Sequence, residues 1–175
     1  IYDIYENRTS IGLLNRYPTK LEPINVDGDS QYEILLWGNN TLIVYNITNM
    51  TIVWSYDCHD IWEIIISDVD CDLADDVIVL GSSWGSDYCY VFDGHTGEVL
   101  AKYEFSGNVC YVWVEDINED SKEELVEICD GKVVIVDLVS GVELWSTEIR
   151  GVDGRLIGFA DCNLDYKIDV IVLYY

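Results

Sequence analysis

The stretch that decides the fold is residues 68–76, Asp68-Val-Asp70-Cys-Asp72-Leu-Ala-Asp-Asp76. Three more stretches repeat its pattern, with Asp, Asn or Glu at positions 1, 3, 5 and 9 and an aliphatic residue directly afterwards. Oxygen-bearing side chains on a short, turned loop are the ligands that Ca²⁺ prefers. We therefore expect one hard-cation site per loop and about four Ca²⁺ in all. The expected side-chain ligands are Asn25, Asp27, Asp29 and Glu33; Asp68, Asp70, Asp72 and Asp76; Asp116, Asn118, Asp120 and Glu124; and Asp161, Asn163, Asp165 and Asp169.

The spacing of the loops predicts the architecture. Their first residues lie 43, 48 and 45 residues apart, and a period in the forties with short strands is typical of propeller blades. Strands are expected before the loops at Ile61–Ser67, Cys110–Glu115 and Arg155–Ala160, and after them at Tyr32–Trp37, Asp76–Leu80, Glu124–Cys129 and Asp169–Tyr175. The prediction is an all-β, four-bladed β-propeller with a calcium loop in each blade.

A hairpin follows each pair of strands. The segments Tyr45–Trp54, Phe92–Ala101 and Val136–Trp145 align with one another, and the glycines after Thr96 and Ser140 suit a turn that needs positive φ. Trp54 and Trp145 fall at equivalent positions, which favours a role in packing between blades.

The single domain, residues 1–175, divides into blades at about 18–57, 58–106 and 107–150, and the fourth blade is split between the two ends of the chain. That blade consists of about 151–175 plus 1–17, because Tyr5–Leu14 fits the hairpin pattern. The N-terminal strands can complete it within one molecule or pair with the C-terminal strands of a neighbour. The second arrangement is head-to-tail, and such contacts form filaments when the rotation does not close.

Composition restricts the partners. The chain has 9 Lys and Arg against 33 Asp and Glu, a formal net charge of −24, so nucleic acid is excluded as a partner on charge. No apolar run approaches the roughly 20 residues of a membrane-spanning helix. Without bound cations, the negative charges should repel one another and destabilise the compact state.

Cysteines and glycosylation sequons indicate the compartment. Six cysteines allow up to three disulfides, the alternative being buried free thiols. Acceptor sequons for N-glycosylation begin at Asn7, Asn39, Asn46 and Asn49. Together with calcium loops they predict a secreted glycoprotein, located extracellularly or at the cell surface.

The loops and the strands that leave them, such as Asp76–Gly81, resemble the FG-GAP/VCBS-type calcium-binding repeats of integrin-alpha-like β-propellers. The hairpin Val91–Leu100 is also similar to the strand pair of quinoprotein-like propeller repeats. The first resemblance implies a further calcium ligand, the main-chain carbonyl of position 7, which here belongs to Gln31, Ala74, Lys122 and Lys167. This chain departs from that family in having only four repeats and in lacking the glycine often found at position 6.

The sequence favours a structural function for the metal. The repeated acids are accounted for as ligands, His59 and His95 are not equivalent in the repeat, and no hydrolase or metalloprotease motif occurs, so we expect no enzyme. The favoured function is a structural or surface-assembly protein, with another copy of itself as a possible partner. An adhesin or a module that binds extracellular protein or carbohydrate, with Trp84 as a contact, is the alternative, and a propeller polysaccharide lyase is the third.

Overall fold

The computed structural model describes residues 20–38, 40–83, 86–105, 109–149, 155–164 and 167–173. These residues form fourteen β-strands and no helix, which confirms the all-β class. Within the described ranges there is accordingly no helix suited to crossing a membrane. The strands are β1 (Lys20–Ile24), β2 (Glu33–Gly38), β3 (Thr41–Asn46), β4 (Thr51–Asp57), β5 (Ile61–Ser67), β6 (Asp76–Ser83), β7 (Ser86–Phe92), β8 (Val99–Glu104), β9 (Val109–Glu115), β10 (Glu124–Cys129), β11 (Lys132–Asp137), β12 (Glu143–Glu148), β13 (Arg155–Ala160) and β14 (Asp169–Leu173).

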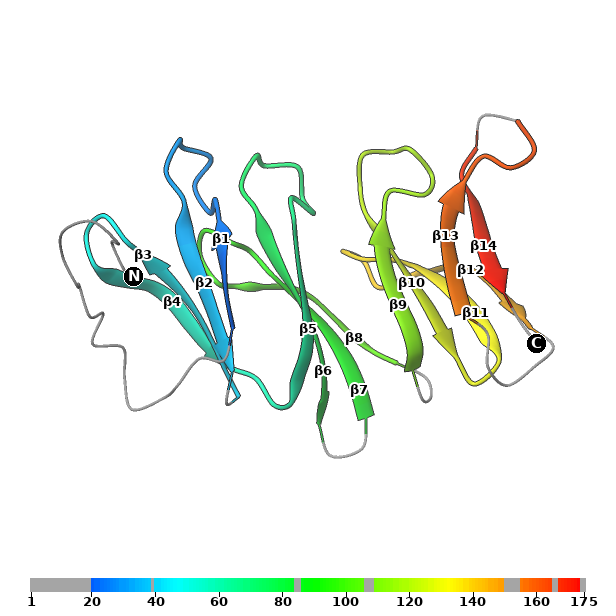
Figure 1. Ribbon diagram of the computed structural model, residues 1–175, viewed down its shortest axis with the longest axis horizontal. Helices are drawn as coiled ribbons and strands as arrows, with labels where there is room; N and C mark the ends of the chain where they lie inside the picture. The colour runs from blue at the N-terminus through cyan, green and yellow to red at the C-terminus, as the bar shows by residue number, and fades with distance from the viewer. Residues whose placement is uncertain are drawn as a thin grey trace.

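The strands form four antiparallel sheets in sequence order (Figure 1). Three sheets have four strands each, β1–β4, β5–β8 and β9–β12, and the fourth contains β13 and β14. Each strand pairs with the next one along the chain, so every sheet is a simple meander. The strands that were expected on both sides of each loop are confirmed within a few residues at their ends.

The three complete hairpins have one register. Val44 pairs with Trp54, Val91 with Ala101 and Ile135 with Trp145, and the register shifts directly after each of these pairs. The alignment of the hairpins from sequence is therefore confirmed, including the equivalence of Trp54 and Trp145.

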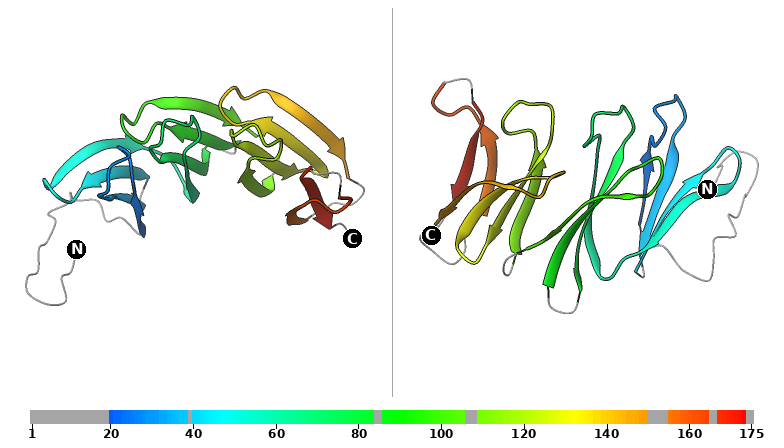
Figure 2. Two further views of the ribbon diagram at one scale, coloured as in Figure 1. Left: turned by 90° about the horizontal axis from the view of Figure 1, so that it is seen from above. Right: turned by 180° about the vertical axis from the view of Figure 1, so that it is seen from behind.

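Successive sheets pack face to face along an open arc, with β1–β4 at one end and β13–β14 at the other (Figure 2). One core lies between the first two sheets and includes Leu35, Val79 and Phe92. A second lies between the second and third sheets, and a third joins β10 to Phe159 and Val170. Because inner sheets are covered on both faces, β6 is apolar from Val77 to Leu80 without alternation.

The described strands do not test the prediction of a fourth blade split between the two ends of the chain. The strands expected within residues 1–17 lie outside the described residues, and the described sheets do not close into a ring (Figure 2). The blade count, the split blade and the closure in one molecule or between two therefore stay predictions.

Cysteines depart from expectation. Cys58, Cys71, Cys89 and Cys162 are free thiols, and Cys129 donates a hydrogen bond to Glu127 at 3.4 Å, so the disulfides predicted for these five are wrong. Cys58, Cys89 and Cys129 are buried, and the first two lie in the cores between sheets. They serve there as small apolar side chains, a common use of unpaired cysteine.

Candidate metal-binding loops

The four acidic loops lie at the same edge of the arc, because each joins the first and second strands of its sheet (Figure 1). Neighbouring loops are bonded to each other. The Asp75 N–H donates to the Asn25 carbonyl at 2.7 Å, and the Asn25 N–H donates to the Asp75 carboxylate at 2.8 Å. The Cys71 thiol donates to the Ser121 carbonyl at 2.8 Å. The first three loops are thus linked into one acidic edge.

In the second loop, the backbone holds three carboxylates in place. Asp68 accepts the N–H groups of Asp72 and Leu73, both at 3.0 Å. Asp70 accepts the Asp72 N–H at 3.2 Å, and Asp72 accepts the Ala74 N–H at 2.8 Å. Positions 1, 3 and 5 are therefore fixed around one turn of backbone.

The third loop repeats this arrangement bond for bond. Asp116 accepts the N–H groups of Asp120 and Ser121 at 3.1 and 2.9 Å, and Asn118 accepts the Asp120 N–H at 2.8 Å. Asp120 accepts the Lys122 N–H at 2.9 Å. Two loops of different sequence thus adopt one hydrogen-bonded geometry.

Position 9 supplies a carboxylate that turns inward. Glu33, Asp76 and Glu124 are only 3%, 2% and 1% exposed. Asp76 accepts the N–H groups of Val69 and Gly94, both at 3.0 Å, and Glu124 accepts the N–H of Ile117 at 3.0 Å. Because burial disfavours the charged form, it raises the pKa of Asp76 to about 6 and also raises the pKa of Glu33 and Glu124. A bound cation would remove this penalty.

The backbone conformation at position 4 is shared by all four loops. Gly28, Cys71, Glu119 and Leu164 have φ values of 69°, 64°, 61° and 63°. Leu73 and Ser121 at position 6 are also left-handed, with φ of 78° and 70°. Side chains other than glycine rarely adopt this region, so the loops hold strained backbone at these positions.

Two observations test whether a cation fits. In the first loop, the buried oxygens Asn25 Oδ1 and Glu33 Oε2 have no hydrogen-bond partner, and these atoms belong to positions 1 and 9. In the second loop, carboxylate oxygens of Asp68, Asp70 and Asp76 lie within 4.8 Å of one another. Buried oxygens without donors and clustered carboxylates both fit a hard divalent ion.

Asp93 is a neighbour that the sequence pattern missed. Its carboxylate lies within 4.8 Å of those of Asp70 and Asp72, although it belongs to the hairpin after β7. Asp137 and Asn46 occupy the equivalent hairpin positions. The recurrence of Asp or Asn at this hairpin position was the sequence signal that could have pointed to Asp93. Asp93 also accepts the Thr96 N–H at 2.7 Å, as an ordinary turn residue does.

The remaining predicted sites are described only in part. In the fourth loop, Asp169 accepts the Cys162 N–H at 3.0 Å, as its counterparts do, while Asp165 lies outside the described residues. Nothing tests the position-7 carbonyls of Gln31, Ala74, Lys122 and Lys167 as ligands.

The glycosylation predictions are also open. Asn7 and Asn39 lie outside the described residues, and Asn49 is exposed. The Asn46 amide is already engaged, since its Nδ2 donates to Glu33 at 2.9 Å. Trp84, the proposed carbohydrate contact, lies outside the described residues.

No protein-family model and no curated protein matches the sequence, so the resemblance to FG-GAP/VCBS repeats rests on the motifs alone. Solved structures do match. The chain superposes on the rhamnogalacturonan lyase YesW with a TM-score of 0.60 and 16% identity, over 90% of this chain and 40% of that one. The exotype rhamnogalacturonan lyase YesX gives a TM-score of 0.58 at 16% identity, over 90% and 39%. The chain therefore spans about two fifths of the length of these lyases and shares their fold over that part.

This likeness contradicts the expectation that the chain is no enzyme, because both similar structures are lyases. The expectation rested on missing local motifs and on the acids being used as metal ligands. A catalytic site can instead be assembled from single side chains on separate sheets, which leaves no local motif in the sequence. At 16% identity the comparison itself shows only the fold.

Proposed function

We propose that this chain is a calcium-stabilised β-propeller scaffold that works outside the cell or at its surface. The unpartnered buried oxygens of Asn25 and Glu33 carry the proposal, since they lie at two expected ligand positions of a loop whose pattern recurs four times. Side-chain oxygens at positions 1, 3, 5 and 9 would hold the ions, which supply positive charge to a chain of net charge −24.

The hydrogen bonds between loops suggest how bound ions would stabilise the structure. Asn25 is bonded to Asp75 of the next loop, and Cys71 to Ser121 of the one after. An ion that orders one loop would therefore also fix its neighbour and hold adjacent sheets in register. Binding to the folded chain alone stabilises it by mass action, by about 2.7 kcal/mol at one hundred times the Kd.

Calorimetric titration of the chelator-treated protein tests this proposal. We expect up to four calcium ions per chain and a rise in melting temperature, with Mg²⁺ binding more weakly because it prefers six ligands in strict octahedral geometry. A protein that binds no calcium and melts at the same temperature in chelator would refute it.

Assembly through the end of the arc is part of the proposal, and Trp145 supports it. Its counterpart Trp54 is buried, donates to the Gly94 carbonyl at 2.6 Å and packs on Gly97 of the next hairpin. Trp145 is 49% exposed, and within the described ranges no equivalent hairpin covers it. Residues 1–17 of the same chain or of a neighbour would provide such a hairpin, and the latter would make a filament. Electron microscopy and light scattering distinguish the two, since closure within one molecule gives only monomers.

A polysaccharide lyase is the second candidate, favoured by the superposition on YesW over 90% of this chain. The calcium loops would then support a site built elsewhere on the sheets. Incubation with rhamnogalacturonan, followed by the ultraviolet absorbance of unsaturated products, tests it. Absence of product from that substrate, with calcium bound and the fold intact, would count against this second candidate and leave the scaffold untouched.

A further inference from the structure

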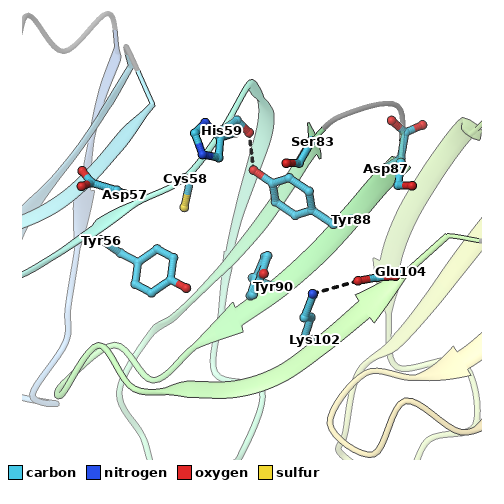
Figure 3. A pocket seen from close by; sticks show the side chains of 11 residues that line it. Tyr56, Asp57, Cys58, His59, Ser83, Asp87, Tyr88, Tyr90, Lys102 and Glu104 are labelled. Atoms are coloured by element: carbon cyan, nitrogen blue, oxygen red, sulfur yellow. Dashed lines mark hydrogen bonds and ion pairs between the residues drawn. The ribbon is translucent and has the colours of Figure 1, made fainter.

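A pocket of about 400 Å³ opens between the first and second sheets, and no described residue of the four acidic loops lines it (Figure 3). Its walls come from the end of β4, the turn after it, and strands β7 and β8. The volume lies in the range of small-molecule sites, about 300–1,000 Å³. Its main walls are three tyrosines, Tyr56, Tyr88 and Tyr90.

The repeat shows how this interface differs from the next one at two equivalent positions. The hairpin registers make Tyr56 equivalent to Tyr103 and Cys58 equivalent to Phe105. Between the second and third sheets, Phe105 is buried and packs edge-on against Tyr103 at 5.4 Å. Cys58 is buried at the corresponding place but is far smaller than phenylalanine. The smaller side chain of Cys58 thus leaves more room in the pocket than a phenylalanine would.

The three rings are oriented as walls of a cage. The planes of Tyr56 and Tyr90 meet at 47° with centroids 6.2 Å apart, and those of Tyr88 and Tyr90 at 74° and 5.1 Å. The Tyr88 hydroxyl donates to the His59 carbonyl, which fixes that ring (Figure 3). Rings that contact one another at such angles present faces of different orientation, whereas a sugar ring stacks on a single face.

Charge decides the class of ligand. Asp57, Asp87 and Glu104 line the pocket against one positive residue, Lys102, which is paired with Glu104 at 2.8 Å. The Lys102 ammonium also lies 5.5 Å from the centre of the Tyr90 ring, a cation–π contact. The pocket therefore already holds an ammonium group against one of its rings. The chain's net charge of −24 attracts further cations and repels anions.

A metal ion is a poor occupant, because the groups of acids able to hold one within the described ranges lie in the second loop and include no residue of this pocket. We propose that the tyrosine cage between the first two sheets binds a small organic cation, an alkylammonium group, on the faces of Tyr56 and Tyr90. This inference does not depend on calcium or on the proposed scaffold function.

Calorimetric titration of the full chain with choline chloride tests the proposal, with sodium chloride at equal ionic strength as the blank. The decisive comparison is dimethylbutanol, the uncharged analogue with carbon in place of the ammonium nitrogen. We expect choline to bind and dimethylbutanol to bind at least about tenfold more weakly, since only the cation is attracted to ring faces. Equal binding of the two, binding of methyl galactoside instead, or no binding of any probe would overturn the proposal.

Two substitutions of Tyr56 distinguish the contribution of its ring to binding from that of its hydroxyl. Tyr56→Leu should weaken choline binding by about three- to thirty-fold, whereas Tyr56→Phe, which keeps the ring, should stay within about twofold. A loss in Tyr56→Phe as large as that in Tyr56→Leu would show hydrogen bonding by the phenol and refute the cage.

Two further variants test the proposal without removing a packed side chain. Cys58→Phe should fill the pocket with the equivalent of Phe105, abolishing choline binding while the circular dichroism spectrum is kept. Lys102→Met, at a side chain 47% exposed, removes the resident ammonium and should tighten choline binding by about threefold or more. Unchanged affinity in Lys102→Met would contradict the proposal even if Cys58→Phe failed to fold.

Discussion

Substitution of Asp76 by asparagine separates a metal ligand from an ordinary backbone cap. Asp76 is 2% exposed, and its two oxygens accept the N–H groups of Val69 and Gly94, both at 3.0 Å. One of its oxygens also lies within 4.8 Å of carboxylate oxygens of Asp68 and Asp70. Asp76→Asn keeps the shape of the side chain but removes one acceptor and the charge.

Without metal, the loss of the charge and the loss of the acceptor change the free energy of unfolding in opposite directions. Burial raises the pKa of Asp76 from 3.8 to about 6, so its charge opposes folding at neutral pH by about 3 kcal/mol, and the substitution removes this penalty. The asparagine NH₂ group, however, must face one of the N–H groups of Val69 and Gly94, which costs about 1–3 kcal/mol. In chelator we therefore expect the free energy of unfolding to change by no more than about 2 kcal/mol.

With calcium, the wild-type protein and the variant differ in how much free energy of unfolding they gain from the ion. The wild-type loop gains about 2.7 kcal/mol when calcium is one hundred times its Kd, and the variant loses most of this because a neutral amide oxygen replaces a carboxylate ligand. Urea unfolding, followed by tryptophan fluorescence in calcium and in chelator, measures both quantities. Asp76→Asn should reduce the calcium-dependent increment by about 2–3 kcal/mol, and calorimetry should find one ion fewer per chain.

Asp137 provides the matched control. It lies in a hairpin, accepts the Ser140 N–H at 2.6 Å, and belongs to neither of the acid groups able to hold a metal in the described part of the chain. Asp137→Asn should cost the same in calcium and in chelator. If Asp76→Asn behaves in that way too, with an equal loss under both conditions, then Asp76 is only a cap and the reasoning is refuted.

Three further predictions use the same unfolding assay. Phe92→Ala should lower the free energy of unfolding by about 3–5 kcal/mol, because Phe92 is fully buried and packs on Tyr56 at 4.7 Å; a loss under about 1 kcal/mol would contradict this packing. Leu73→Gly should raise it by about 0.5–1 kcal/mol, because Leu73 has φ of 78° and is 82% exposed, and any decrease would show that the loop is unstrained. The metal-free chain should lose up to about 3 kcal/mol as pH rises from 4 to 6, since the raised pKa of Asp76 makes the folded state bind the proton more tightly. In calcium the trend should reverse, because protons compete with the ion; a parallel dependence in both media would contradict it.

Local features were predictable from sequence because their causes are local. The strands beside the second loop, Ile61–Ser67 and Asp76–Ser83, follow from an apolar run on each side of an acidic turn. The hairpin register follows from the turn residues, and the register shift repeats after Val44, Val91 and Ile135.

Long-range features were not predictable, because they depend on how one sheet packs on the next. Trp54 and Trp145 have equivalent positions, yet one is buried by the following hairpin and the other is half exposed. The six cysteines suggested disulfides by number, but Cys89 lies in a core where a thiol packs against apolar neighbours. Asp93 approaches Asp70 only through the fold of the second sheet. No count or spacing in the sequence contains these contacts.

A repeated chain separates two kinds of signal. What recurs in every unit, such as the left-handed residue at position 4 from Gly28 to Leu164, serves the architecture that all units share. What differs at one equivalent position serves something that the architecture does not require. Phe105 and Cys58 are such a pair: the larger residue buries apolar surface and stabilises its interface, while the smaller one gives up that packing and leaves a cavity between tyrosines. The recurrent loops and the pocket beside Cys58 are therefore two separate places where the function of this chain can be tested.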